Sequence, residues 1–547
     1  MAGISLLIFM CLLGFSTQRS TPEDTSYTAA VVEYQVQSNS TINLKNYVVL
    51  IQDASAQGAD IVVFPEMTLT RRESVVVPIN GALKEYPIPA LQPEMYDEIL
   101  VSISEAARQN QIYVVINVQE VLNCTDDATV EYCPERKLYL FNTNVVFDRN
   151  GAVIDRYRKI NLFGEATRTP ALTPDLGIFE TDFGVTFGHY ICFDLMFQVP
   201  AVQVVEKKNI TDIVFTTMWF SEMPYLTAVQ IQQAYAHSMN VNFLASGANN
   251  VGVGSAGSGI YSGKAGALIS IMPGVPTTRL LVSKVPKVPG EVEGTYPGPI
   301  YDDPSTHDDL ILITDPSLPS HVTRLLREES EDFALFDKDV LCHFQVKLRK
   351  RDGATNYRYR AAAFSGVRSF SGVATGGTRM CSVFACTGDT IDTCGKRFDK
   401  FEPNTTGIFD ELRITATVPE AKVNEGLNAS EAAYFPISLD TAIMPLKTND
   451  YTFEKIMFFD LVTIITMDLK NVDAELYTFS VWGRQYTTDG QTATPPVEQN
   501  DDDGSSTGTD TTLPPATTDD DSGPGAAVTN SISVTLLVAV VMILLWQ

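Results

Sequence analysis

Gly188-His-Tyr-Ile-Cys-Phe-Asp-Leu-Met-Phe197 begins as an apolar strand and runs into a tight turn, which would expose the thiol of Cys192. A lone cysteine in a strand is more often a small core side chain than a catalyst. A thiol presented by a turn, however, has the access that a nucleophile needs. Two further fragments could supply partners: Ile61-Val-Val-Phe-Pro-Glu66 ends an apolar strand in a carboxylate, and Arg156-Tyr-Arg-Lys-Ile-Asn-Leu-Phe163 carries Lys159 within another strand. Together these residues predict amide hydrolysis through a thioester.

The residues around this stretch, from 26 to about 290, alternate apolar strands with amphipathic helices, which predicts an α/β fold. The expected strands are 27–35, 60–64, 112–118, 143–148, 152–159, 212–216 and 241–246, and the expected helices are 44–57, 96–109, 200–208 and 226–239. Arg149-Asn-Gly151 is a hairpin turn signal, so the strands on either side of it should be antiparallel. A sheet that mixes hairpins with helical crossovers argues against a purely parallel, doubly wound fold.

Composition divides the chain into five predicted segments. They are a signal peptide at 1–20, a catalytic domain at 26–295, a β-rich C-terminal domain at 300–490, an acidic Ser/Thr/Pro/Gly stalk at 495–525 and a glycolipid (GPI) attachment signal at 526–547. The apolar stretch of the first segment is too short to span a bilayer, although its missing basic region leaves an uncleaved anchor as an alternative. Near the other end, Ser522 is the first candidate for the attachment residue, followed by Gly523 and Gly525, because small residues precede a polar spacer and an apolar tail.

The net charge of -27 argues against nucleic acid as a partner. The stalk contributes eight negative charges, Glu498 and seven aspartates, so the rest of the chain still carries about -19 (-27 + 8). An acidic surface repels the phosphate backbone. The stalk is also too poor in apolar residues to fold, and its Ser, Thr and Pro content suits O-glycosylation.

The cysteine count predicts one free thiol. Eight cysteines are present, and removal of Cys11 with the signal peptide leaves seven, an odd number for a secreted protein. Cys124 and Cys133 flank a polar loop and could form a local disulfide bond. The four cysteines of the C-terminal half, which allow three pairings, are Cys342, Cys381, Cys386 and Cys394. Cys192 is then unpaired by elimination. The glycosylation sequons, which agree with secretion, are at Asn39, Asn123, Asn209, Asn404 and Asn428.

Three other patterns point to different chemistry, and each has a simpler explanation. His189 could form a dyad with Cys192, but residues three apart in a strand face opposite sides, so we expect a hydrogen-bonded structural histidine. Gly252-Val-Gly-Ser-Ala-Gly257 matches a dinucleotide motif, yet no helix follows and no acidic residue occurs before Glu291, which favours a glycine-rich loop at the rim of a pocket. The histidines show no metal-site spacing, so we expect neither a metal nor a cofactor.

The fragments together resemble the nitrilase superfamily, and specifically its vanin and biotinidase branch. The matching motifs are Phe64-Pro-Glu66, Arg156-Tyr-Arg-Lys-Ile-Asn-Leu-Phe163, Cys192-Phe-Asp194, Val241-Asn-Phe-Leu-Ala-Ser246 and Gly257-Ser-Gly-Ile-Tyr261. The resemblance covers roughly residues 26–490 and is thin in the C-terminal domain. It implies a nitrilase-type α-β-β-α sandwich followed by a smaller, disulfide-stapled β-rich domain.

The resemblance also implies a role for each site residue. Glu66 would be the general base, Lys159 the stabiliser of the tetrahedral intermediate and Cys192 the nucleophile. The backbone N–H of Phe193 would be a second donor to the oxyanion. Glu165 matches an auxiliary glutamate that could orient Lys159, and a further match, near the pocket, is Trp219.

The choice of substrate stays open at this point. The loop 163–170 is shorter than is usual in the family, and Met67-Thr-Leu-Thr70 differs from the usual continuation after the base. We expect the mature protein to be held at the extracellular face of the plasma membrane by a lipid anchor. By the same resemblance, the attachment signal favours pantetheine as the small-molecule amide substrate. Hydrolysis of biotin amides such as biocytin is the alternative. A third hypothesis is a non-catalytic surface protein that only displays the β-rich domain.

Overall fold

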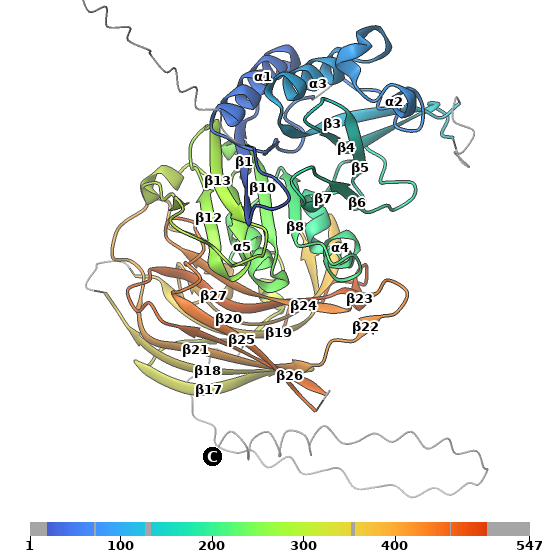
Figure 1. Cartoon of the computed structure of the whole chain (residues 1–547). Helices are drawn as coiled ribbons and strands as arrows, with labels where there is room; N and C mark the ends of the chain where they lie inside the picture. Colours follow the sequence, from blue (N-terminus) through green and yellow to red (C-terminus); the bar gives the residue numbers. More distant parts are fainter. Residues whose placement is uncertain (1–18, 71–72, 126–132, 352–355, 460, 500–547) are drawn as a thin grey trace, which may run out of the picture. The chain divides into compact units, whose positions relative to one another are not determined.

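The computed structural model describes residues 19–70, 73–125, 133–351, 356–459 and 461–499, which all belong to one compact unit (Figure 1). The predicted signal peptide up to residue 18, the stalk from residue 500 onward, with the candidate attachment residue Ser522, and the attachment signal lie outside the described residues. Within the described ranges, no helix is both long enough and apolar enough to cross a bilayer.

The first half of the described chain is built on two β-layers that join along β1 and β10. The first layer, in the order β13-β1-β2-β3-β4-β5, contains β1 (Ser26–Gln35), β2 (Ile61–Val63), β3 (Tyr113–Asn123), β4 (Leu138–Phe147), β5 (Val153–Arg158) and β13 (Arg279–Pro286). The second, in the order β6-β7-β8-β10-β11-β12-β14, contains β6 (Gly177–Glu180), β7 (Thr186–Ile191), β8 (Asp212–Thr217), β10 (Asn242–Asn249), β11 (Ser258–Ser262), β12 (Gly266–Ile271) and β14 (Gly298–Pro299). The helices are α1 (Ser40–Ala56), α2 (Ala82–Glu85), α3 (Glu98–Asn110), α4 (Gln203–Glu206) and α5 (Ala228–Met239).

The side-chain alternation of β1 shows how these layers pack. Ala29 and Val31 belong to the apolar cluster between the two β-layers, whereas Ala30 and Val32 belong to the cluster beneath α1 and α3. On the other side of the molecule, α5 contacts β10, β11 and β12 of the second layer. Figure 1 shows α1 and α3 side by side above the first layer and α5 on the far side of the second. The order of these layers, helices, sheet, sheet and helix, confirms the predicted α-β-β-α sandwich.

Two local predictions have different outcomes. Arg149-Asn-Gly151 does turn the chain between β4 and β5, which are antiparallel, with Gly151 at a φ of +78°. The helix predicted over 200–208 does open at Pro200, but it begins as part of a π-type turn at Gln198–Val202, continues as α4 from Gln203 and ends at Glu206, two residues earlier than expected. Val199 has extended dihedral angles there, as expected for a residue that precedes a proline, and Pro200 has no N–H to donate.

The second half of the described chain consists of two five-stranded antiparallel sheets. One has the order β16 (Val322–Leu325), β19 (Arg358–Phe370), β20 (Ala374–Cys386), β27 (Leu476–Gln485) and β24 (Ala432–Asp440). The other has the order β17 (Ser330–Asp337), β18 (Val340–Arg349), β21 (Ile408–Pro419), β26 (Val462–Leu469) and β25 (Tyr451–Phe458). This arrangement confirms a β-rich C-terminal part.

Disulfide bonds hold this part together and settle the open pairings. Cys342 of β18 is bonded to Cys381 of β20, so this bond ties the two sheets to each other. A second bond in this half, Cys386 to Cys394, is local, and in the first half Cys124 is bonded to Cys133, as predicted. Cys192 is the one free cysteine within the described residues, as elimination predicted.

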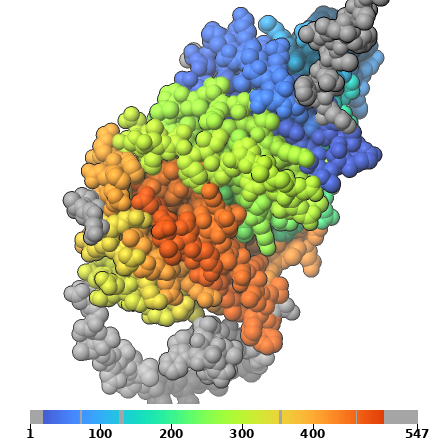
Figure 2. Space-filling model, turned by 60° about the vertical axis from the view of Figure 1, so that its left-hand side comes forward, coloured from blue at the N-terminus to red at the C-terminus, as the bar shows by residue number. Residues whose placement is uncertain are grey.

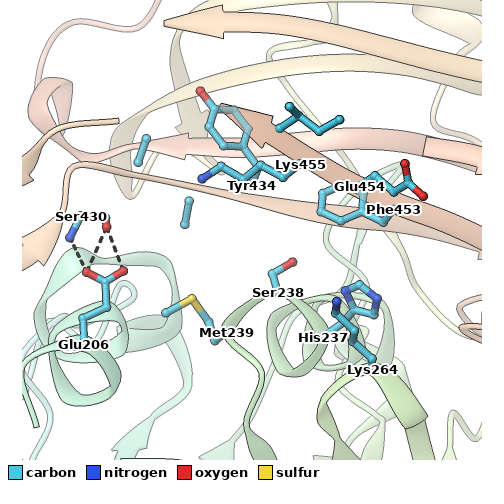
Figure 3. A pocket seen from close by; sticks show the side chains of 13 residues that line it. Glu206, His237, Ser238, Met239, Lys264, Ser430, Tyr434, Phe453, Glu454 and Lys455 are labelled. Carbon is cyan, nitrogen blue, oxygen red and sulfur yellow. Dashed lines mark hydrogen bonds between the residues drawn. The ribbon is translucent and has the colours of Figure 1, made fainter. Parts of the chain in front are cut away.

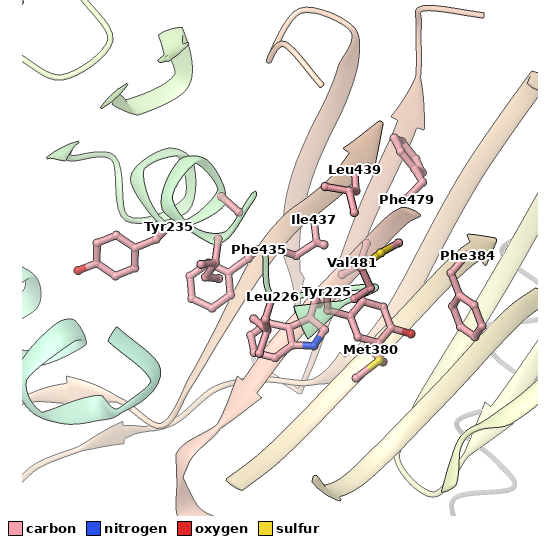
Figure 4. Close-up of a cluster of buried hydrophobic side chains, with 14 of the residues drawn as sticks. Tyr225, Leu226, Tyr235, Met380, Phe384, Phe435, Ile437, Leu439, Phe479 and Val481 are labelled. Atoms are coloured by element: carbon pink, nitrogen blue, oxygen red, sulfur yellow. The ribbon is translucent and has the colours of Figure 1, made fainter. Parts of the chain in front are cut away.

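The two halves share an apolar core that positions the segment around residues 219–226. Tyr235 of α5 stacks on Phe435 of β24 with ring centroids 6.4 Å apart, and Tyr225 donates or accepts a 2.8 Å hydrogen bond with Ser382 of β20. Figure 4 shows this cluster, whose labelled members are Tyr225, Leu226, Tyr235, Met380, Phe384, Phe435, Ile437, Leu439, Phe479 and Val481. In Figure 2 the green residues of the first half lie directly against the orange and red residues of the second. The β-rich half therefore buttresses one wall of the site described next.

Candidate active site

Cys192 stands at an abrupt change of backbone direction. β7 ends at Ile191, and Cys192 opens a 3₁₀ helix, Cys192–Met196, with a φ of +48°. A non-glycine residue in this left-handed region costs on the order of 1 kcal/mol or more, so its surroundings must hold it there. Asp194 does so, because its carboxylate accepts hydrogen bonds from the N–H of Ile191 at 3.2 Å, the hydroxyl of Tyr157 at 2.7 Å and the N–H of Asn161 at 2.8 Å.

Lys159 is a buried cation between two carboxylates. It follows β5 directly, and its side chain is 1% exposed. Its Nζ donates to Oε1 of Glu66 at 2.8 Å and to Oε1 of Glu165 at 2.5 Å. A lysine is seldom buried unless it is paired, and here one partner, Glu165, is six residues away while the other, Glu66, comes from a distant part of the sequence. The structure thus places Glu165 against Lys159, as the resemblance implied.

Glu66 is buried just after β2 and is linked to Cys192 through one backbone unit. Its Oε2 accepts from the N–H of Met218 at 2.7 Å, while the carbonyl oxygen of Met218 lies 3.6 Å from Sγ of Cys192 and accepts from the thiol. Its Oε1 also accepts from Nδ2 of Asn142 at 2.7 Å. Every oxygen of this carboxylate is therefore oriented before a substrate arrives.

Electrostatic forces within the group oppose one another. Burial raises the pKa of the Cys192 thiol well above its ordinary value, and Glu66 raises it further, while Lys159 lowers it. Burial by itself would lower the pKa of Lys159, but the charges of Glu66, Cys192 and Glu165 raise it well above the ordinary value. Burial would raise the pKa of Glu165, yet Lys159 lowers it below the ordinary value. The resting site therefore combines a neutral thiol with a charged lysine.

The pocket beside Cys192 is formed by both halves of the described chain. Its lining residues are Phe163, Cys192, Phe193, Met196, Trp219, Phe220, Glu222, Leu226, Phe370 and Ser371. The last two lie at the tip of the hairpin that joins β19 to β20 in the β-rich half. Trp219 belongs to the wall, and its indole N–H already donates to the carbonyl of Leu226 at 2.8 Å. Ring contacts surround Phe193, with centroids 4.9 Å from Phe163 and 5.4 Å from Phe370.

Other residues singled out in the sequence lie elsewhere. His189 is buried and bonded through Nε2 to Asp155 at 2.7 Å, which agrees with strand alternation. The glycine-rich loop supports the pocket wall without lining it, because the carbonyl of Gly254 accepts from the N–H of Ser221 at 3.0 Å and the N–H of Gly257 donates to buried Glu33. All five sequon asparagines are exposed. Among the residues described, no cluster of three or more potential ligands could hold a metal ion.

A larger cavity, of about 550 Å³, lies away from the group formed by Glu66, Lys159 and Cys192 (Figure 3). It is bordered by the end of α5 at His237 and Ser238, and by Glu206, whose carboxylate accepts from the N–H of Ser430 at 2.6 Å and from its hydroxyl at 2.9 Å. Despite its size, it contains none of Glu66, Lys159 and Cys192. Chemistry rather than volume therefore identifies the smaller pocket as the candidate active site.

Sequence reasoning missed several polar residues that organise the site. Asn142 of β4 donates to both Glu66 and Glu165, and its own oxygen accepts from Asn117 at 2.8 Å. The available signal was a set of amide side chains within otherwise apolar strands, at positions where burial demands a hydrogen-bond partner. Glu222 and its partner Arg368 were also missed, and no local motif marks either of them.

Comparison with known proteins agrees with this geometry. Residues 28–271 match the carbon-nitrogen hydrolase family, and residues 312–489 match the vanin C-terminal domain. Vanin-like protein 1 of Drosophila melanogaster is 34% identical, in an alignment that covers 89% of this chain and 90% of that protein. Pantetheinase of Canis lupus familiaris is 29% identical, with 75% and 86% covered, and biotinidase of Takifugu rubripes is 28% identical, with 69% and 82% covered.

Proposed function

Because this chain belongs to the vanin-like family of carbon-nitrogen hydrolases, we propose that it cleaves pantetheine to pantothenate and cysteamine. Amide hydrolysis itself follows from the family. The choice of pantetheine is supported by the pantetheinases among its relatives and by the apolar pocket beside Cys192. The observation that carries the proposal is the link from Glu66 through Met218 to Cys192, with Lys159 fixed beside them.

Each residue then has one task in the reaction. As Sγ of Cys192 attacks the amide carbonyl, the thiol proton passes to Glu66, and the new oxyanion is held by Lys159 and the N–H of Phe193. Glu66 gives the proton to the departing amine when the C–N bond breaks, which leaves a thioester on Cys192. Glu66 next takes a proton from water, whose hydroxide adds to the thioester. Cys192 leaves with that proton, and the acid is released.

The proposed substrate is tested by assaying the purified protein with pantetheine and with biocytin. We expect release of cysteamine from pantetheine, and no release by Cys192→Ala that retains the wild-type unfolding temperature. Turnover of biocytin alone would replace the proposed substrate with a biotin amide, to which relatives named biotinidase correspond. Inactivity toward both, together with alkylation of Cys192 no faster than in the denatured chain, would favour a non-catalytic surface protein.

We also propose that the mature protein is held at the extracellular face of the plasma membrane by a glycolipid attached near Ser522. The support is the order of small residues, polar spacer and apolar tail in the sequence. A phosphatidylinositol-specific phospholipase should release the protein from intact cells. Retention of the protein on the cells together with an epitope from residues 526–547 would contradict the anchor.

A further inference from the structure

Glu222 is the one carboxylate among the described residues that line the pocket beside Cys192. The rest of the wall is mostly apolar or aromatic, and the side chain of Glu222 is only 7% exposed. A hydrogen bond to a carboxylate in such surroundings is stronger than it would be in water. None of the bonds that orient Glu66, Lys159 and Cys192 involves Glu222, so the catalytic group does not explain why a carboxylate is there.

Glu222 is held in place from both halves of the chain. Its N–H donates to the carbonyl of Leu226 at 3.0 Å, and its carbonyl accepts from the N–H of Leu226 at 2.8 Å. Its carboxylate accepts from Nη2 of Arg368, on β19, and from the hydroxyl of Ser371 at the tip of the same hairpin. A side chain fixed in this way keeps one orientation toward the pocket, as recognition of a substrate group requires.

The charges around Glu222 do not balance. Arg368 is fully buried, and its other terminal nitrogen lies 3.4 Å from Oδ2 of Asp315, so two carboxylates share one guanidinium. Burial raises the pKa of Glu222 to about 7, and Asp315 adds to that rise while Arg368 opposes it. A hydrogen-bond donor that entered the pocket would compensate the excess negative charge.

We propose that Glu222 is a specificity-determining residue that accepts a hydrogen bond from a hydroxyl group on the acyl part of the substrate, with Arg368 and Ser371 as its positioning residues. The inference rests on the proposed function, because the acyl part of pantetheine bears hydroxyl groups on a branched carbon skeleton. The aromatic wall covers the skeleton, and Glu222 binds the hydroxyl. Acyl groups without a hydroxyl leave Glu222 unpaired and are disfavoured.

The test compares kcat/KM for pantetheine with kcat/KM for an analogue whose hydroxyl groups are replaced by hydrogen. We expect the wild-type protein to prefer pantetheine by on the order of 100-fold. Glu222→Leu combined with Arg368→Met removes the charges of both members of this ion pair and should reduce the preference to within about threefold. Glu222→Gln retains an acceptor oxygen and should keep most of it. Glu222→Asp keeps the charge but shortens the side chain, and should lower the preference about tenfold even if the double variant fails to fold.

Glu206→Leu is the matched control, because Glu206 also bonds a residue of the β-rich half but borders the other cavity (Figure 3). It should keep the full preference. A wild-type protein that cleaves both compounds equally well, or a folded double variant that still prefers pantetheine, would overturn the role of Glu222 alone. Failure of the wild-type protein to cleave pantetheine would instead overturn the proposed substrate, and this inference with it.

Discussion

Two buried cations lie next to residues of the same pocket, Lys159 beside Cys192 and Arg368 beside Glu222, and each cation lies between two carboxylates. Lys159 bonds Glu66 and Glu165, whereas Arg368 bonds Glu222 and faces Asp315. Both cations are almost fully buried, so both clusters are costly to desolvate. The two clusters, to which we assign catalysis and substrate binding, are thus built from nearly the same charges.

The difference lies in what each cluster touches and in which cation it uses. Lys159 carries a compact ammonium and is electrostatically coupled to the thiol of Cys192, so its cluster can exchange protons and hold a new negative charge. Arg368 carries a planar guanidinium that keeps its charge, stacks over Phe370 with its Cζ 4.7 Å from the ring centroid, and joins the two halves of the chain. We infer that the first cluster moves protons and the second fixes geometry.

The same substitution in both clusters gives the largest expected contrast. Glu66→Gln removes the proton acceptor but keeps the shape of the side chain, and should lower kcat by roughly 10²- to 10⁴-fold. Glu222→Gln should change kcat by less than about tenfold, since Arg368 and Ser371 can still bond the amide. Steady-state kinetics on the two purified variants measure the contrast. Equal losses of kcat would contradict the division of tasks between the clusters.

A smaller effect, on stability, should come from Arg368→Met. This change leaves Glu222 and Asp315 buried without their cation, so the free energy of unfolding should fall by about 3 to 5 kcal/mol at pH 8. Adding Glu222→Leu removes one of the stranded charges and should recover most of the loss, while Asp315 keeps its hydrogen bond from the N–H of Ser317. Urea unfolding of the single and double variants measures both steps. A double variant less stable than Arg368→Met would show that Glu222 is not the main unpaired charge.

The first cluster could be predicted from the sequence and the second could not. Glu66 and Cys192 each follow an apolar strand, and Lys159 follows the more polar strand β5 directly, so the local pattern of each fragment indicates a side chain in or just after a strand. Glu222 and Arg368 are 146 residues apart, in segments without such a pattern. In the sequence, each looks like an ordinary charged residue at the surface. Only the packing of the β-rich hairpin against the first half brings them together.

The same reasoning explains the other outcomes. Strand and helix order followed from hydrophobic periodicity, and one free cysteine followed from counting. Counting could not predict the pairing of Cys342 with Cys381, because this pairing depends on which strands of the two sheets face each other. The π-type turn that precedes α4 leaves no mark in the apolar pattern around Pro200, so it could not be predicted.

The smallest expected effect concerns how the free energy of unfolding depends on pH, because Glu222 and Glu165 should contribute to it with opposite signs. Burial raises the pKa of Glu222 to about 7 from an ordinary 4.5, so the folded chain keeps a proton there that the unfolded chain has lost. Its contribution to stability is full below pH 4.5 and is lost as the pH rises to about 7, by at most about 3 kcal/mol. Glu165 should act in the opposite sense, because Lys159 lowers its pKa, and its contribution is lost as the pH falls.

Unfolding free energies measured from pH 4 to pH 8 for the wild type, Glu222→Gln and Glu165→Gln separate these contributions from those of other buried carboxyls. Subtracting the Glu222→Gln curve from the wild-type curve should leave a difference that declines with rising pH, and subtracting the Glu165→Gln curve should leave one that increases. If both differences changed with pH in the same direction, the two cations would compensate their carboxylates in the same way. The lysine cluster, which exchanges protons, would then no longer differ from the arginine cluster, in which two carboxylates share one cation. The reason for expecting Glu222 to accept a hydrogen bond from a substrate hydroxyl would be lost with that difference.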